Sequence, residues 1–432
     1  MSELDLGLKI GIRRLFWSMG LSTRLDVQLR GFSRATELAT RKAPAQSFTD
    51  LDVLGVGVTG SYRLFTEIAD CKTSRRESTS RMFWVRGVAD LFGADHAYLV
   101  REHEVTDGAR QLAARLGVTV LPSDDLGRLQ EHHYRAGPDF EGEVAILFDR
   151  QQVASHLAAF NDLGRNLQPL VDYRQFDYWI YDEYRNPTQL IAHLGEARKH
   201  LDYRNPFHVA LFLDCCWLYL LSLIKVTSHI RGAFLGEPDR GLQEYIFGGP
   251  ANLREKVIVA DLLRGFGPDD TRNINHLPSY YRPLRELVVR LLRRPNQMQT
   301  ALRYAETATA LAAAKTRIPL AEVFAERHFD PVAAKLVADV CGFLVAAADL
   351  DPGFRFRARA YLLAEQPPSE RASGRDQPGE RGPSGTANEP SPVPAQPDGE
   401  QRSETASLAT QDGLWPTEES TATPPPDHRK QP

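Results

Sequence analysis

The sequence predicts three regions: an α/β domain over residues 1–135, a mostly α-helical domain over 140–365 and a disordered tail over 366–432. Short apolar runs that alternate with amphipathic segments predict a sheet flanked by helices in the first region. Longer segments with helical periodicity predict the second region. The tail holds 13 of the 28 prolines and almost no aliphatic residues, so it cannot bury enough apolar surface to offset its chain entropy.

The first region alternates helices and strands. Its first helix has apolar residues on one face and a C-terminal stop at Gly20, and Gly117 ends a later helix in the same way. The basic segment 21–48 is too long for a simple connection, and its sequence assigns it to no element. In chain order we predict a helix over 10–21, strands over 51–56 and 64–69, a helix over 81–92, a strand over 97–100, a helix over 109–116, a strand over 118–121 and a helix over 124–129.

Two acidic residues fall where buried strands are predicted. Asp52 lies inside the run 51–56, and Asp70 ends the run 64–69 and is followed by Cys71 and Lys72. Desolvating a carboxylate costs several kcal/mol unless it is paired or binds a metal. Because side chains alternate along a strand, Asp70 and Lys72 project from one face. Two carboxylates that converge with a lysine favour a site for a hard divalent cation.

An aspartate followed eighteen residues later by Asp-x-Lys resembles the motif of the restriction-endonuclease-like superfamily. The predicted order of elements adds to this resemblance. So does the piece AARLGVTVL at 113–121, in which a helix rich in alanine and leucine leads through a glycine into a short strand. Residues 5–130 are in these respects similar to the Mrr-type nuclease domains and to related Holliday-junction-resolvase-like proteins.

This resemblance implies a fold, a cofactor and a set of site residues. Asp52, Asp70 and the backbone carbonyl of Cys71 would hold Mg²⁺ or Mn²⁺, and Lys72 would orient the attacking water during phosphodiester hydrolysis. Aspartate at 70 departs from many relatives, which have Glu or Gln there. Asp50, on the same strand face as Asp52, is an additional acid that can share or replace its role.

Arginines follow the lysine closely, at Arg75, Arg76, Arg81 and Arg86. Guanidinium groups contact nucleic-acid phosphates, so these residues are candidates for a nucleic-acid-binding surface. A solvated loop and a polar helix face explain them equally well.

The helical region carries no catalytic motif. An aromatic group can stack on bases or pack in a core; it comprises Phe176, Tyr178, Trp179, Tyr181 and Tyr184. The run 209–224 contains Asp214 and is short for a bilayer span, which favours a buried helix. The predicted helices are 150–161, 188–200, 207–230, 253–264, 282–293, 298–315, 331–349 and 354–364.

Composition bounds the compartment and the partners. The net charge is −4, and the tail accounts for −5, so the remainder is near neutral and neither requires nor excludes a nucleic-acid surface. The four cysteines have no disulfide or zinc spacing, and the N-terminus lacks a signal-peptide pattern. We therefore expect a cytoplasmic protein that does not contact a membrane.

The functional hypothesis is a metal-dependent nuclease, acting on DNA rather than RNA, in restriction, repair or defence. Its helical domain would recognise substrate or a protein partner, and paired strand cleavage favours a homodimer. One alternative is an inactive nuclease-fold scaffold that binds nucleic acid or protein. Another is a mainly helical interaction protein whose N-terminal Asp-x-Lys is accidental. For the motif itself, the alternative to a catalytic site is a partly exposed salt bridge between Asp70 and Lys72 on an edge strand.

Overall fold

The computed structural model describes residues 3–30, 47–74, 78–136, 144–161, 163–180, 182–266, 276–324 and 329–365. These described residues belong to one compact unit. The predicted disordered tail lies outside the described residues.

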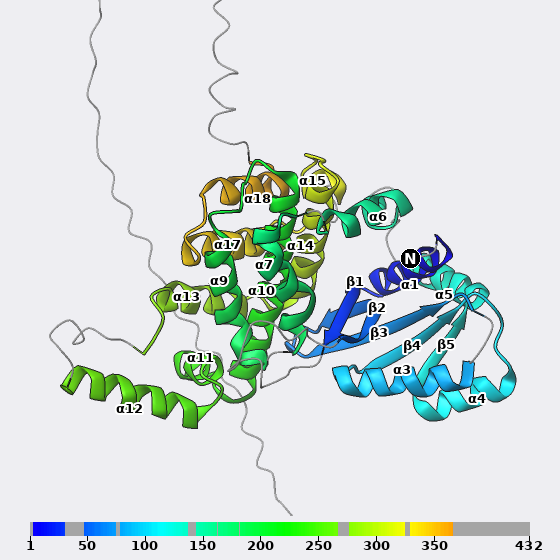
Figure 1. The fold of residues 1–432 in the computed structure, drawn as a ribbon, viewed down its shortest axis with the longest axis horizontal. Helices are drawn as coiled ribbons and strands as arrows, with labels where there is room; N and C mark the ends of the chain where they lie inside the picture. Colours follow the sequence, from blue (N-terminus) through cyan, green and yellow to red (C-terminus); the bar gives the residue numbers. More distant parts are fainter. Residues whose placement is uncertain are drawn as a thin grey trace, which may run out of the picture. The chain divides into compact units, whose positions relative to one another are not determined.

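Five strands form one mixed sheet in which neighbours follow chain order (Figure 1). Among the first three strands each neighbouring pair is antiparallel, and among the last three each neighbouring pair is parallel. The predicted sheet flanked by helices is confirmed. The third strand is the central one, so the expected placement of Asp70 and Lys72 on an edge strand is wrong. The ion pair between them that the same alternative expected is present, at 3.7 Å. The strands are β1 (Ser22–Arg30), β2 (Ser47–Val58), β3 (Leu64–Lys72), β4 (His96–Arg101) and β5 (Val118–Pro122).

Strand β1 occupies part of the segment that sequence reasoning left unassigned. Leu25, Val27 and Leu29 alternate there with polar residues, which is the pattern of a half-buried strand. The preceding helix α1 (Glu3–Ser18) ends at Gly20, whose φ of +90° is in the region that favours glycine. The short connection then starts β1 at the sheet edge next to the helical region.

Helices cover both faces of the sheet (Figure 1). On one face α1 and α5 (Ser123–Ala136) bury a cluster that includes Phe16, Val53 and Val100. On the other face lie α3 (Ser78–Phe92) and α4 (Asp107–Leu116). The predicted end of α4 is confirmed, because Gly117 has a φ of +64°. The helix begins two residues earlier than predicted, where Thr106 accepts a hydrogen bond from the N–H of Ala109.

The helical region contains every helix predicted for it. These are α6 (Arg150–Ala159), α9 (Asn186–Ala197), α10 (Pro206–Ala233), α12 (Pro250–Phe266), α13 (Tyr281–Leu292), α14 (Met298–Ala313), α17 (Pro331–Ala347) and α18 (Gly353–Leu363). The described residues add the shorter helices α7 (Gln168–Asp172), α8 (Tyr178–Ile180), α11 (Pro238–Ile246) and α15 (Leu320–Val323), with a π-turn over Tyr173–Asp177 and 3₁₀ turns over Ala145–Leu147, Arg165–Leu167, Glu183–Arg185 and Pro295–Gln297.

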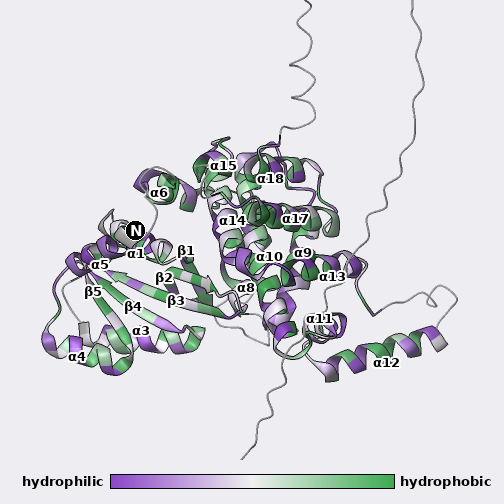
Figure 2. Ribbon diagram, turned by 180° about the vertical axis from the view of Figure 1, so that it is seen from behind, coloured by the Kyte–Doolittle hydropathy of each residue, from purple (hydrophilic) through white to green (hydrophobic). Residues whose placement is uncertain are grey.

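Helix α10 is the centre of this region. It is long and apolar enough to cross a membrane, but 94 % of its most apolar window is buried against the rest of the structure. The predicted buried helix is therefore confirmed. Figure 2 shows hydrophobic residues along α10 and α17, which pack against each other and against α14.

The sheet and the helical region share one apolar cluster. Helix α14 packs on α10 with one side and contacts β1 and β2 with another. Polar contacts cross the same junction: the indole N–H of Trp217 donates to Ser22 at 2.8 Å, and the Tyr62 hydroxyl donates to the carbonyl of Leu291 at 2.9 Å. The edge strand β1 is therefore packed against the helices of the second region.

Candidate functional site

Strands β2 and β3 part at the residues of the sequence motif. Their last paired residues are Val53 and Ala69, so Asp52 is the first residue of β2 that no longer pairs with β3. The Oδ2 atom of Asp52 instead accepts a hydrogen bond from the backbone N–H of Cys71 at 2.7 Å. A buried carboxylate therefore satisfies the backbone of β3 where its neighbour leaves it.

A lysine from α1 lies against this carboxylate. Lys9 Nζ is 2.8 Å from Oδ1 of Asp52 and also forms an ion pair with Asp26. Its side chain is only 7 % exposed. Burial by itself lowers the pKa of Lys9, but the attraction of Asp52 and Asp26 outweighs burial and the net pKa is raised. Lys9 is therefore a permanent positive charge that bridges two carboxylates.

Asp26 belongs to this group although sequence reasoning did not single it out. It lies in β1 opposite Asp52, between residue pairs that keep the antiparallel register. Its φ of +54° is in the left-handed region, which aspartate tolerates better than most residues. Burial raises the pKa of the Asp26 carboxyl, Lys9 lowers it in part, and the charges of Asp52 and Asp50 raise it further.

Three carboxylates meet at this point. Asp26, Asp50 and Asp52 each place one oxygen within 4.8 Å of the other two. Asp50 is exposed, and it is the additional acid expected from the sequence. Carboxylate oxygens are the ligands that hard divalent cations prefer, and against Lys9 the three leave an excess of two negative charges. The three carboxylates could therefore hold a metal ion, and its identity as Mg²⁺ or Mn²⁺ stays a prediction.

Asp70 has a different partner. Arg81 in α3 donates from Nε and Nη2 to the two carboxylate oxygens of Asp70, with the Nε contact at 2.7 Å. Lys72 Nζ is farther away, 3.7 Å from Oδ1. Arg81 is itself placed over the ring of Trp84, 3.4 Å from the centroid. Asp70 is therefore held by Arg81, and its role as a metal ligand and the role of Arg81 as a phosphate contact stay predictions.

The other predicted site residues are Arg75, Arg76, Arg86 and Cys71, and their positions do not test the roles predicted for them. Arg86 pairs with Asp90 one turn later on an exposed helix face. Arg75 and Arg76 lie outside the described residues. The thiol of Cys71 is buried in the core on the α1 side, and burial raises its pKa well above the usual range. A role of the Cys71 carbonyl in metal binding stays a prediction.

A cleft of about 610 Å³ opens over the three carboxylates. Asp26, Asp50, Asp52, Lys9 and Lys72 line its sheet side. The opposite side comes from the helical region and includes Leu157, Phe160, Asn161, Arg174 and Trp179. Of the predicted site residues, Asp50, Asp52, Cys71 and Lys72 therefore line a cleft together with residues of the helical region, and Asp70 is not part of that lining.

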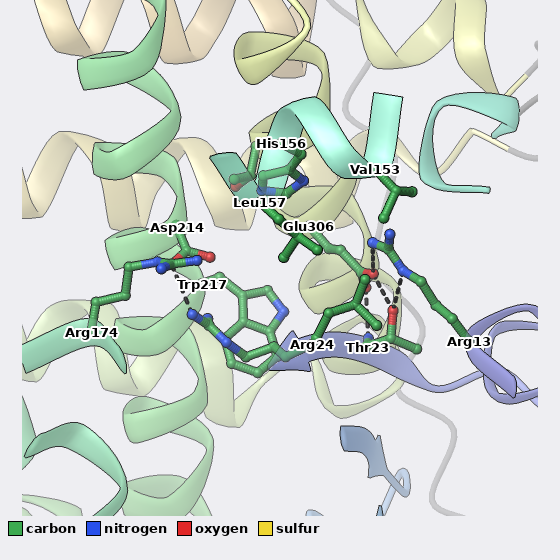
Figure 3. A pocket seen from close by; sticks show the side chains of 12 residues that line it. Arg13, Thr23, Arg24, Val153, His156, Leu157, Arg174, Asp214, Trp217 and Glu306 are labelled. Carbon is green, nitrogen blue, oxygen red and sulfur yellow. Dashed lines mark hydrogen bonds and ion pairs between the residues drawn. The ribbon is translucent and has the colours of Figure 1, made fainter. Parts of the chain in front are cut away.

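A smaller cavity of about 40 Å³ shares part of that lining, including Arg24 and Arg174. Asp214 of α10 accepts a hydrogen bond from Arg24 Nη2 at 2.9 Å and pairs with Arg174 (Figure 3). Burial by itself raises the pKa of Asp214, but the two arginines outweigh it and hold the pKa at about 2. Asp214 is therefore ionised and shared by two cations.

Glu306 of α14 is the second acid at this cavity (Figure 3). Its carboxylate accepts hydrogen bonds from Arg13 Nη2 at 2.9 Å, from the Ser22 hydroxyl at 2.8 Å and from the Thr23 N–H at 2.7 Å. One side chain from the helical region therefore joins α1 and β1.

Sequence reasoning missed several charged residues here. Asp214 offered a signal, because a lone carboxylate in the apolar run 209–224 needs a partner once the helix is buried. Asp26 offered a weaker one through the alternation of β1. Lys9, Arg24 and Glu306 gave none, since their partners are distant in the chain.

Comparison with models of known protein families, with curated proteins and with solved structures found no match.

Proposed function

We propose that this protein is a divalent-metal-dependent nuclease that hydrolyses phosphodiester bonds, of DNA rather than RNA, in restriction, repair or defence. One observation carries the proposal: Asp26, Asp50, Asp52 and Lys72 line the same cleft at the point where two strands part. The likeness of the motif to restriction-endonuclease-like proteins supports it as well.

The chain offers a coherent division of roles. Asp26, Asp50 and Asp52 would hold the cation, which when bound supplies Lewis-acid chemistry toward a phosphate oxygen and lowers the pKa of a water. Lys72 has a side chain that is 39 % exposed, so its ammonium can donate to a phosphate oxygen that gains charge. Lys9 keeps the carboxylates of Asp26 and Asp52 in position.

The helical region supplies the other wall of the cleft, which suits a role in recognising the substrate or a protein partner. Each chain carries one such carboxylate group among its described residues. Paired cleavage of the two strands of a duplex would therefore favour a homodimer.

A second candidate function has an observation in its favour. Lys9 already neutralises part of the charge on Asp26 and Asp52, and Arg81 binds both oxygens of Asp70. A nuclease fold that binds nucleic acid or protein without cutting has no need of a metal, and compensated carboxylates are what such a scaffold would carry.

Metal binding separates these two candidates. We would titrate Mn²⁺ into wild type, Asp50→Asn and Asp90→Asn by calorimetry, because Asp50 is exposed and its change leaves the core intact. Asp90 is the matched control, since it is exposed and ion-paired but distant from the cleft lining. The nuclease proposal expects binding that weakens at least tenfold in Asp50→Asn and is unchanged in Asp90→Asn.

Cleavage is the second measurement. Supercoiled, linear and single-stranded DNA and RNA would be incubated with Mg²⁺ or Mn²⁺ and with wild type or Lys72→Ala. DNA cleavage that disappears with chelator and in Lys72→Ala supports the proposal. Absence of both metal binding and cleavage in folded wild type would establish the scaffold. Cleavage that persists in Lys72→Ala and in Asp50→Asn would place the chemistry elsewhere.

A further inference from the structure

Beside the carboxylates, the lining of the cleft also includes a pair of arginines with only one carboxylate between them: Arg24 in β1, two residues from Asp26, and Arg174 from the helical region. Arg24 and Arg174 share the single carboxylate of Asp214, and both arginines line the cleft. Their side chains are 8 % and 11 % exposed, so water does little to compensate the surplus. A buried charge without a matching counter-charge is expensive unless an anion reaches it.

The hydrogen bonding of Arg24 is incomplete as well. Its Nη2 binds Asp214, but Nη1 is buried without a hydrogen-bond partner among the described residues. Trp179 lines the same cleft, and its indole N–H also has no hydrogen-bond partner among the described residues. The guanidinium carbon of Arg24 is 5.7 Å from the ring centroid of Trp179. Nearly all buried polar atoms in native proteins have a partner, so these two donors, on residues that line one cleft, call for an acceptor.

A neighbouring histidine, His156, is also influenced by these arginines. His156 lies at the small cavity that shares Arg24 and Arg174 with the cleft (Figure 3). Burial is the largest cause that lowers its pKa, to about 3, and the charges of Arg13, Arg174 and Arg24 lower it further, while Asp214 opposes them. Burial is thus the main cause of this low pKa, and the arginine charges add to it.

We infer that Arg24, with Arg174 and Trp179, forms a subsite for a phosphate group of a single nucleic-acid strand lying in the cleft. A planar guanidinium suits a phosphate, and Trp179 adds a donor and a ring on which a base can stack. The volume of about 610 Å³ is that of a cleft for a ligand of one or two nucleotides. The identification of the strand as the source of the phosphate rests on the proposed function.

The carboxylate group and the arginine group would then contact different phosphates of one strand. The carboxylates of Asp26, Asp50 and Asp52 would lie next to the phosphodiester that is attacked. Arg24 and Arg174 would bind a neighbouring phosphate. A free phosphate ion offers the same chemistry to Arg24, and it would bind without a strand.

The test uses the full chain in chelator, so that it does not depend on cleavage. Anisotropy of a labelled single-stranded oligonucleotide, and calorimetry with inorganic phosphate, would be measured for wild type, Arg24→Gln, Arg24→Lys and Arg282→Gln. Arg282 is the matched control, an arginine with an 85 % exposed side chain outside the cleft lining. Circular dichroism and melting temperature verify folding, which Arg174 supports in Arg24→Gln by keeping its contact with Asp214.

We expect Arg24→Gln to bind the strand about tenfold more weakly, with Arg24→Lys between it and wild type and Arg282→Gln unchanged. The slope of log affinity against log salt should fall by about 0.7 in Arg24→Gln, one phosphate contact fewer. Phosphate binding that is lost in Arg24→Gln, without strand binding, supports the subsite and assigns it to the free ion.

Equal strand and phosphate binding in folded wild type and Arg24→Gln overturns the inference, as does the absence of binding of either probe to wild type. If Arg24 variants do not fold, quenching of tryptophan emission by the strand in wild type, lost in Trp179→Phe, supports the subsite; quenching that is equal in both contradicts it. Binding through Arg24 without cleavage in metal leaves the subsite intact and removes the nuclease. Cleavage with Arg24-independent binding removes the subsite alone.

Discussion

The two charged groups that face the cleft differ in sign and in exposure. The carboxylate group of Asp26, Asp50 and Asp52 has surplus negative charge and one exposed member, Asp50. The arginine group of Arg24 and Arg174 around Asp214 has surplus positive charge and is buried. Strand β1 contributes to both, so one edge strand holds opposite charges at neighbouring positions.

The difference teaches which charges hold the fold and which are open to a ligand. Burial makes each contact of Asp214 matter for stability, because an unpaired charge there has no water to replace its partner. Exposure of Asp50 lets its charge be changed at little structural cost. Substitutions ordered by burial therefore separate the two roles.

The largest effect is expected at Asp214. Asp214→Asn leaves Arg24 and Arg174 buried without their shared counter-charge, so the free energy of unfolding should fall by about 3–5 kcal/mol. Urea denaturation followed by circular dichroism measures this. A loss below about 1 kcal/mol would show that water or an anion already compensates the arginines.

A smaller loss is expected when the ammonium is removed from the carboxylate group. Lys9→Met leaves Asp26 and Asp52 facing each other without their bridge, and should lower stability in chelator by about 2 kcal/mol. Millimolar Mg²⁺ should raise the melting temperature of Lys9→Met more than that of wild type, because the cation replaces the lost charge. Equal shifts in both proteins would contradict metal binding at these carboxylates.

The pH dependence should report His156. Its pKa in the folded protein is about 3, below the ordinary value of 6.5, so on acidification the unfolded chain takes up a proton first. Stability should therefore fall as the pH drops from 6.5 toward 3, by about 1 kcal/mol per unit from this residue. His156→Gln should flatten the curve of unfolding free energy against pH. Identical curves for the two proteins would show that His156 titrates normally.

The smallest effect is expected on the exposed face of α3. Arg86 and Asp90 form an ion pair one turn apart with side chains that are 40 % and 60 % exposed. Arg86→Gln should change the free energy of unfolding by less than about 0.5 kcal/mol. The same variant tests the predicted phosphate contact, because strand binding that weakens as much as in Arg24→Gln would move the nucleic-acid surface to α3.

The sequence predicted the elements whose patterns are local. The helices of the second region and four strands of the sheet follow from periodicity, and Gly20 and Gly117 marked helix ends that need a positive φ. Strand β1 was missed because the sequence between it and the next strand gave no boundary. Its alternation of Leu25, Val27 and Leu29 was the signal available.

The candidate site was predictable only in part. Asp52 and Lys72, both predicted from the sequence, line one cleft, and Asp50 lies with Asp26 and Asp52. The partners of these residues come from α1 and from the helical region, and pairing between distant segments leaves no trace in spacing. The attachment of Asp70 to Arg81 could likewise not be read from an eleven-residue separation.

The carboxylate of Glu306 has a mechanical consequence. It fastens α14 to α1 and β1 through Arg13, Ser22 and Thr23, behind the walls of the cleft. The two sides of the cleft cannot move apart without breaking the hydrogen bonds of the buried Glu306 carboxylate. We therefore expect the cleft to keep a constant width. Its rigid walls would then select ligands by their thickness.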